Sequence, residues 1–485
     1  MTDVLIAGAG PAGLLLACEL RLAGLATTLL ERHAEPPGYC RSFTLNARSL
    51  DLLALRGLAA PLVAEGWQAP QAPFSGLPVT LSLAGARTGH PYTLGIAQTR
   101  VEEVLEAHAR DLGVDLRRGH ELRSLRQDAD SVVATVGGPQ GEHRIEAAYL
   151  AGCDGGRSTV RRQAGIAFPG TEATRFSLLG DVELTDPDAL PYGVTTGPGG
   201  AVFVIPRPGH VRIVTDDPHP PADRDTAVTL GLLESAVEHA LGRRIGLRTP
   251  RWLTRFGNAA RQATDYVRGR VVLAGDAAHI HPPAGAIGVN VALDDAMNLG
   301  WKLAATVRGA APAHLLGTYH TERHAAGARV LMTTRAQMML GEARDDIAPL
   351  AGLLTRIAAH PDGNRAIAEV LTGLDTRYDM RPAGEHPWLG RLAPNLALVA
   401  AGAPTDVATL LAPGRPVLLD LTGQGTASRP AAGWADRLDI VAATCPDRPD
   451  LAALLLRPDG HAAWVSATGD AGLSEALRHW LGERL

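Results

Sequence analysis

Three closely spaced glycines near the start of the chain are the first residues that point to chemistry. The segment Gly8-Ala9-Gly10-Pro11-Ala12-Gly13 has the spacing GxGxxG, which is typical of turns that bind a pyrophosphate. The first two glycines permit a tight turn and let the backbone approach the phosphates, and the third lets a helix pack closely on a strand. The N-terminus of the helix that follows would face the anion and favour its negative charge.

The elements expected around this turn are those of a dinucleotide-binding unit. The apolar run 4–7 predicts a buried parallel strand, residues 14–23 predict a helix that ends at Gly24, and residues 26–30 predict a second strand. The second strand ends in Glu31, about twenty residues after the turn, where a carboxylate accepts hydrogen bonds from the adenosine ribose hydroxyls. A glycine-rich turn without a ligand is the alternative, but the strand, the helix and the acid favour a true site. The motif alone does not distinguish NAD from FAD.

A second candidate segment surrounds Asp276. This residue follows the apolar run 271–274 and precedes a loop rich in proline and glycine, so we expect it at the C-terminal edge of a parallel sheet, where α/β folds bind ligands. A helix N-cap is the alternative role for this Asp. Beyond residues 282–290, apolar residues recur at helical spacing and predict a helix; these residues are Leu293, Met297, Gly300, Ala304 and Val307. The backbone amides at the N-terminus of this helix would favour negative charge.

Further motifs connect these segments to a known family. They are Glu31-Arg32, Arg41, Arg48, Gln98 at the start of a predicted helix, Cys153-Asp154-Gly155-Gly156-Arg157-Ser158, and the segment 268–279, which contains Ala274-Gly275-Asp276. In this order the motifs resemble those of the class A flavoprotein monooxygenases, the FAD-dependent aromatic hydroxylases, from Met1 to about Trp464. The closer likeness is to hydroxylases of bacterial aromatic polyketide pathways, especially those that act on angucyclinones, and it is carried by residues 119–121, 149–160 and 457–464.

The resemblance implies an α/β fold with a discontinuous layout. A Rossmann-like FAD-binding domain would be accompanied by a substrate domain of mostly antiparallel sheet, laid over the flavin, and by a C-terminal thioredoxin-like domain. The expected ranges are 1–73, 95–175 and 255–370 for the FAD-binding domain, 74–94 and 176–254 for the substrate domain, and 385–485 for the thioredoxin-like domain. The last domain lacks a CxxC motif, so its expected role is structural.

The resemblance also implies roles for individual residues. Asp276 and Gln98 would contact the ribityl chain of FAD. Asp154 would lie near the pyrophosphate and take part in nicotinamide cofactor binding, with an ion pair to Arg157 or Arg161 as the alternative. The other cofactor-binding candidates are the glycine turn, Glu31, Arg32, Arg41, the Leu122 backbone at the adenine, Pro283 in the wall between flavin and substrate, and Gly288, Val289 and Asn290 at the isoalloxazine ring.

The sequence departs from the family where the flavin ring is expected. The family usually reads Gly-Gly-Gln-Gly-Met-Asn, whereas this chain reads Gly285-Ala286-Ile287-Gly288-Val289-Asn290. Ile287 therefore replaces a polar side chain beside the flavin. Arg48 has two expected roles, a contact on the flavin side or orientation of the helix that follows it.

The activity implied is hydroxylation of a polycyclic aromatic polyketide. NADPH or NADH would reduce the FAD, molecular oxygen would add at the flavin C4a position, and the resulting hydroperoxide would oxygenate an electron-rich ring carbon. The sequence has no second dinucleotide fingerprint, so we expect the nicotinamide cofactor to bind transiently, and no catalytic acid or base is identified. Baeyer–Villiger or ring-cleaving oxidation of a quinone polyketide is one alternative. A flavin-binding partner protein without redox turnover is another.

Composition and charge exclude several other classes. The chain has 46 basic and 51 acidic residues, a formal charge of −5 and no basic block, so nucleic acid and membranes are not expected partners. It has no secretory signal and no apolar run of roughly 18 residues, which predicts a cytoplasmic protein. A homodimer is left open. No metal site is predicted, because the Cys and His residues lack the required spacing; they are Cys18, Cys40, Cys153, Cys445, His279 and His281.

Overall fold

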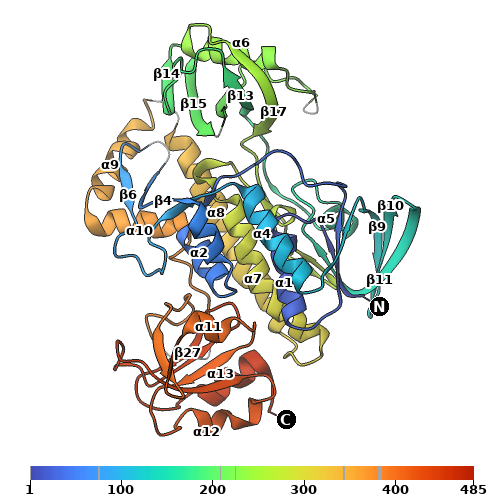
Figure 1. The fold of residues 1–485 in the computed structure, drawn as a ribbon, viewed down its shortest axis with the longest axis vertical. Helices are drawn as coiled ribbons and strands as arrows, with labels where there is room; N and C mark the ends of the chain where they lie inside the picture. Colours follow the sequence, from blue (N-terminus) through green and yellow to red (C-terminus); the bar gives the residue numbers. More distant parts are fainter. Residues whose placement is uncertain are drawn as a thin grey trace. The chain divides into compact units, whose positions relative to one another are not determined.

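The chain forms two units whose course is shown in Figure 1. The computed structural model describes residues 2–74, 77–207, 209–223, 226–341, 345–380 and 385–484. Unit 1 comprises Met1–Pro169 and Gln262–Leu485, and unit 2 comprises Gly170–Arg261. Unit 2 is therefore inserted between two halves of unit 1, and the predicted substrate range 176–254 falls within it.

An eight-stranded sheet forms the centre of unit 1, in the order β19-β20-β11-β1-β2-β8, with β10 and β9 added beside β11. Strands β20, β11, β1, β2 and β8 run parallel, and the central strands are buried, as is usual for parallel sheets, whose faces are covered by helices. This arrangement confirms the predicted Rossmann-like α/β fold. The strands are β1 (Thr2–Ala7), β2 (Thr27–Glu31), β8 (Asp115–Arg118), β9 (Glu121–Gln127), β10 (Val132–Gly138), β11 (Gly141–Gly152), β19 (Val267–Arg268) and β20 (Val271–Leu273).

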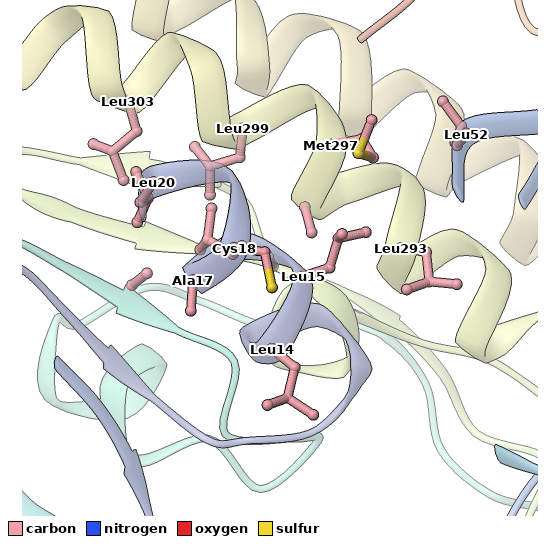
Figure 2. Packing of buried hydrophobic residues seen from close by; sticks show 14 of the residues in the cluster. Leu14, Leu15, Ala17, Cys18, Leu20, Leu52, Leu293, Met297, Leu299 and Leu303 are labelled. Carbon is pink, nitrogen blue, oxygen red and sulfur yellow. The ribbon is translucent and has the colours of Figure 1, made fainter. Parts of the chain in front are cut away.

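Two helices, α1 (Pro11–Leu22) and α7 (Gly288–Val307), pack against each other in the main core of unit 1. Figure 2 shows this packing, in which Leu15 and Leu20 lie with Leu293 and Met297 in one buried cluster. The contact fixes the start of α7 relative to the glycine turn before α1. The other helices of unit 1 outside its C-terminal part are α2 (Ala47–Ala54), α3 (Ala59–Glu65), α4 (Gln98–Asp111), α5 (Thr159–Gln163), α8 (Leu315–Leu340), α9 (Ala348–Ala358) and α10 (Pro361–Thr372).

The C-terminal part of unit 1 has its own six-stranded sheet, in the order β23-β22-β25-β24-β26-β27. The runs predicted as strands at 417–421 and 439–441 are β24 and β25, which pair in parallel. The elements are β22 (Ala397–Ala400), β23 (Ala403–Asp406), β24 (Val417–Asp420), β25 (Asp439–Thr444), β26 (Ala453–Leu456), β27 (Ala462–Ser466), α11 (Val407–Leu411), α12 (Ser428–Ala431) and α13 (Leu473–Leu481). In the described part of the chain, no helix is both long and apolar enough to cross a membrane.

Unit 2 is built on a five-stranded antiparallel sheet, as predicted for the substrate domain, in the order β14-β15-β16-β13-β17. Helix α6 (Leu230–Leu241) covers one face of this sheet, where Leu178, Val204 and Ile213 form a buried cluster with Leu233 and Val237. The strands are β13 (Phe176–Leu184), β14 (Gly193–Gly197), β15 (Gly200–Arg207), β16 (His210–Asp216) and β17 (Leu247–Gly257).

The predicted substrate domain joins 74–94 to 176–254, and the division by contacts assigns the first segment to unit 1 and the second to unit 2. Strand β6 (Thr80–Ser82) of the first segment pairs with β5 (Gln71–Pro73). Asn364 of α10 accepts a hydrogen bond from Ser82 N–H at 2.7 Å and donates one to Thr80 C=O at 3.0 Å. These contacts join residues about 280 positions apart, so no local pattern in the sequence could reveal them.

Candidate functional site

In the glycine turn, a side chain would have room at Gly10 but would clash at Gly8 and Gly13. A Cβ on Gly8 would lie 2.3 Å from Cys153 O, and one on Gly13 would lie 1.9 Å from Gly8 O, so both positions require glycine for packing. A Cβ on Gly10 would meet no atom of the described residues within 4 Å. Helix α1 starts at Pro11 without a side-chain cap, and the first N–H groups of a helix have no acceptor within it. The turn thus offers donors and space to an anion, as a pyrophosphate site requires.

Glu31 lies at the end of β2, beside this turn. Its Oε2 accepts a hydrogen bond from Ala9 N–H at 3.0 Å, and its Oε1 accepts one from His33 N–H at 2.9 Å. Its backbone carbonyl accepts a hydrogen bond from His120 N–H at 2.9 Å, which brings the start of β9 to the same place. Leu122 follows on β9 with its side chain buried. A contact of its backbone with adenine stays a prediction.

Gln98, Arg41 and Glu31 share a neighbour that the sequence did not single out, Glu102. Gln98 opens α4 and donates from Nε2 to Glu102 Oε1 at 2.8 Å. Burial raises the pKa of Glu102, Arg41 opposes this rise, and the carboxylate of Glu31 adds to it. Glu102 thus interacts with Gln98 through a hydrogen bond and with Arg41 and Glu31 through their charges, and Arg32 is exposed directly after β2. The spacing of Gln98 and Glu102, one helical turn, is the signal that could have revealed Glu102.

Three predicted segments meet at one edge of the central sheet. Ala7 of β1 lies beside Gly152 of β11, which in turn lies beside Leu273 of β20. Because these strands are parallel, the residues that follow them meet at the carboxyl edge, where α/β sheets bind ligands. These residues are Gly8, Cys153-Asp154 and Ala274-Gly275-Asp276.

Asp154 has one satisfied and one unsatisfied carboxylate oxygen. Oδ2 accepts hydrogen bonds from Thr159 N–H at 2.6 Å and Val160 N–H at 3.1 Å. Oδ1 is buried and has no hydrogen-bond partner among the residues that the structure describes. Arg161, one of the two alternative partners predicted for Asp154, donates to Ala277 C=O at 2.8 Å. A buried acceptor without a donor suits a hydroxyl or N–H group of a ligand.

Asp276 lies in a single 3-10 turn, Gly275–Ala277, directly after β20. The residue at the N-cap position of this turn is Ala274, so Asp276 is not its N-cap. Its side chain is exposed at the carboxyl edge of the sheet. Asp295 of α7 holds the turn, because its Oδ2 accepts hydrogen bonds from Gly275 N–H at 3.0 Å and from His279 Nε2 at 2.7 Å.

The start of α7 presents its backbone and not its side chains. The helix begins at Gly288 without a side-chain cap, so Gly288 and Val289 lie where N–H groups lack helical acceptors. The Asn290 side chain is occupied, because it accepts a hydrogen bond from Asn46 N–H at 2.8 Å and donates one to Thr44 C=O at 3.3 Å. Any contribution of Asn290 to a ligand must therefore come from its backbone.

The loop before α7 contains the departure from the family pattern. Pro283 precedes a 3-10 turn, Ala284–Ala286, in which Ala286 has a φ of +51°, a conformation that favours glycine. Ile287 is buried in an apolar cluster with Val291 and Leu371. The isoleucine therefore has a packing role that a polar side chain could not fill.

Arg48 pairs with α7. Its guanidinium donates to both carboxylate oxygens of Asp294 at 3.0 Å, and both side chains are buried. Burial alone would raise the pKa of Asp294, but Arg323 and Arg48 hold it well below its usual range. The structure thus identifies Asp294 and Asp295 as polar positions that the apolar pattern of α7 hid.

The described residues contain no group of three or more His, Cys, Asp and Glu side chains that could hold a metal ion. The donor set instead fits FAD. The open Gly10, the unsatisfied oxygen of Asp154 and the exposed Asp276 offer, respectively, room for a pyrophosphate, an acceptor for a donor group and an acceptor for ribityl hydroxyls.

Comparison with known proteins agrees with this chemistry. A family model for an FAD binding domain matches residues 1–334, and a model for the C-terminal domain of aromatic-ring hydroxylases matches residues 386–483. The chain is 43% identical to 12-dehydrotetracycline 5-monooxygenase/anhydrotetracycline 6-monooxygenase of Streptomyces rimosus, over 99% of both chains. It is 40% identical to dialkyldecalin synthase of Streptomyces rugosporus, also over 99% of both chains.

Among solved structures, CabE, an aromatic hydroxylase from angucycline biosynthesis, superposes with a TM-score of 0.94 at 40% identity and covers 100% of both chains. Matches that span the whole length of both proteins relate all parts of the chain and not the FAD-binding part alone. The chain therefore belongs to the family of FAD-dependent aromatic-ring monooxygenases that its motifs predicted.

Proposed function

We propose that the protein hydroxylates a polycyclic aromatic polyketide, with NADPH or NADH as transient reductant and molecular oxygen as co-substrate. The observation that carries the proposal is the full-length similarity to enzymes named for tetracycline and angucycline oxidation. The convergence of the predicted segments at the carboxyl edge of the sheet supports it, because such an edge can hold one extended cofactor.

The chain's own residues would hold FAD in the following way. The glycine turn and the N-terminus of α1 bind the pyrophosphate, Glu31 binds the adenosine ribose, and Asp276 binds the ribityl chain. The first N–H groups of α7 would stabilise negative charge on the flavin ring. When bound and reduced, FAD would activate molecular oxygen for insertion, and the protein would orient the substrate and exclude water.

The substrate contact is proposed on the sheet face of unit 2 that α6 does not cover. Side chains alternate between the two faces of a strand, so Phe203, Arg212 and Trp252 lie opposite the cluster under α6. Phe203 pairs across the strands with Val194, and both are exposed. Arg212 is buried, donates to both oxygens of Asp181 at 2.7 Å, and lies 5.1 Å from the centre of the Trp252 ring. This face offers exposed apolar area to an aromatic ring, and the charge pair of Arg212 and Asp181 is buried beneath it.

Substrate-stimulated oxidation of NADPH tests the proposal. Purified holoenzyme is supplied with NADPH, NADH, oxygen and a panel of anhydrotetracyclines and angucyclinones, and the products are analysed by mass spectrometry and NMR. The expected result is faster NADPH oxidation with at least one polyketide and a product that gains one oxygen as an aromatic hydroxyl. Gain of one oxygen with replacement of a ring ketone by an ester or lactone carbonyl in the NMR spectrum would favour the Baeyer–Villiger alternative.

A second candidate is a non-redox reaction in which FAD serves as a structural group. It is favoured by the similarity to a protein named dialkyldecalin synthase, which matches as much of the chain as the monooxygenases do. Turnover of a substrate without NADPH and under nitrogen would identify this activity. Tight FAD binding with no polyketide-stimulated NADPH oxidation would also favour the non-redox reaction.

The cytoplasmic location and the homodimer remain predictions. Fractionation of the native host and light scattering of the purified holoenzyme test them separately.

A further inference from the structure

The segment 457–464, which carried part of the family likeness, has no place in the proposed cofactor site. It starts at Arg457, after β26, and forms a buried turn that runs into β27. Arg457 donates to both oxygens of Glu322 on α8, at 2.7 and 2.9 Å, and its guanidinium lies within 5.4 Å of the ring centres of Trp301, Tyr378 and Trp480. The turn is therefore anchored on α8 through Glu322 and packs against α7 through Trp301.

A continuous chain of hydrogen bonds starts at His461 in this turn. Nη2 of Arg48 lies 3.0 Å from Nε2 of His461, and the same guanidinium donates to both oxygens of Asp294. Arg323 then joins the two neighbouring carboxylates of α7, because its Nη1 donates to Asp294 Oδ2 at 2.6 Å and its Nε donates to Asp295 Oδ1 at 2.7 Å.

The chain of hydrogen bonds ends at Asp295, beside the Gly275–Asp276 turn of the candidate flavin site. Asp295 Oδ2 accepts hydrogen bonds from Gly275 N–H and from His279. Gly275 immediately precedes Asp276, the residue assigned to the ribityl chain, and His279 begins the strand that leads into the loop before α7. All the side chains from His461 to His279 are at least nine-tenths buried, so water does not compete for these contacts.

We propose that His461 and Arg48 are positioning residues through which the C-terminal domain sets the geometry of the Gly275–Asp276 turn at the flavin. His461 fills this role as an acceptor. Arginine only donates, so Nε2 of His461 must be unprotonated to accept from Arg48, and the proton then lies on Nδ1, 3.1 Å from Asp459 Oδ1. The proposal rests on the assignment of FAD to this site and not on the identity of the substrate.

The test compares two replacements of His461 in the purified holoenzyme. His461→Leu removes the acceptor, whereas His461→Gln keeps an oxygen that can accept from Arg48. We expect His461→Leu to raise the FAD dissociation constant about 10-fold, as loss of one link to a charged group predicts, and to change the visible circular dichroism of the bound flavin. His461→Gln should restore most of both signals, although both variants replace the same ring.

Two further variants separate positioning from stability. Leu477→Ala removes a fully buried side chain of α13 in the same domain, away from the hydrogen-bond chain, and serves as the control for a loss of melting temperature. Arg48→Gln breaks the same chain of hydrogen bonds at a residue outside the C-terminal domain. It tests the proposal if His461→Leu does not fold. In the Arg48→Gln background, His461→Leu should add little, because both act through one link.

The proposal is overturned if His461→Leu and Arg48→Gln change the FAD constant and the flavin spectrum no more than Leu477→Ala does at an equal loss of melting temperature. It is also overturned if the effects of His461→Leu and Arg48→Gln simply add. Because both readouts concern bound FAD, a failure here is distinct from a failure to find a polyketide substrate.

Discussion

The Glu31 carboxylate accepts a hydrogen bond from Ala9 N–H at 3.0 Å, which ties the end of β2 to the glycine turn that follows β1. A carboxylate offers about four acceptor positions, and among the described residues only Ala9 and His33 donate to this one. Glu31 can therefore bind ribose hydroxyls without releasing the turn. We therefore expect this side chain both to hold the turn and to bind the cofactor.

Replacement of Glu31 tests this double role. Glu31→Gln keeps the shape of the side chain but removes its charge and one acceptor oxygen. We expect the FAD dissociation constant to rise about 10-fold to 100-fold, the range for one hydrogen bond to a charged group. Titration of the apoprotein with FAD, followed by flavin fluorescence, measures it. Glu35→Gln, at an exposed position in the same segment, is the control. An equal constant for both variants would remove Glu31 from the site.

The glycine turn offers a matched pair of substitutions. Gly10→Ala places a methyl group where no protein atom lies within 4 Å, whereas Gly13→Ala places one 1.9 Å from Gly8 O. Gly10→Ala should leave the melting temperature of the apoprotein nearly unchanged and abolish FAD retention. Gly13→Ala should destabilise the apoprotein itself. Normal FAD binding by Gly10→Ala would show that the open space does not receive the pyrophosphate.

Ala286 is a position where glycine should stabilise the protein. At a φ of +51° the Cβ of Ala286 destabilises the folded protein by about 1–2 kcal/mol. Glycine removes this strain, but its greater freedom in the unfolded chain offsets roughly 0.5–1 kcal/mol of the gain. Ala286→Gly should therefore raise the free energy of unfolding by about 0.5 kcal/mol. Ala284→Gly, in the helical part of the same turn, should lower it. Urea unfolding of the two variants checks the opposite signs.

Lys302 is the single lysine of the chain and should be inert in the native protein. It is fully buried, and it donates from Nζ to Glu322 and to Asn298, each at 2.8 Å. Burial lowers the pKa of Lys302 to about 7, so a large neutral fraction would make an accessible amine reactive at pH 8. We expect an amine-reactive ester to label only the α-amino group until the protein is unfolded. Peptide mapping by mass spectrometry decides this, and native labelling of Lys302 would contradict the burial.

Glu322 should make stability depend on pH in the acid range. Burial alone would raise the pKa of Glu322, but Arg457 and Lys302 lower it to about 2. Because the folded-state pKa is below the usual value of 4.5, the stabilisation is complete above pH 4.5 and is lost as the pH falls toward 2.

Glu322→Gln measures this contribution. It should lower the free energy of unfolding by about 3 kcal/mol at pH 7, the lower end for breaking a buried ion pair, and the difference from the unmodified protein should shrink between pH 4.5 and 2. Urea unfolding of the holoenzyme at several pH values is the measurement. Glu475→Gln, at an exposed position, should show no such trend. A difference that stays constant with pH would refute the assignment.

Local pattern in the sequence was sufficient for the elements that carry FAD. The apolar run 4–7, the glycine turn and Glu31 predicted β1, α1 and β2, because strand burial, turn geometry and helix starts depend on neighbouring residues. The order of such motifs along the chain also indicated the family. Asp276 was placed correctly at a strand end by the same local signals.

Only the tertiary structure decided which distant residues meet. The sequence assigned 74–94 to the substrate domain, whereas Asn364 holds it in unit 1. It left two roles open for Arg48, whose partners Asp294 and His461 lie 246 and 413 residues away. Hydrogen bonds and ion pairs depend on distance in space, and no local periodicity records it. The chain of hydrogen bonds from His461 to His279 therefore depends on how the helices pack, and no single motif predicts it.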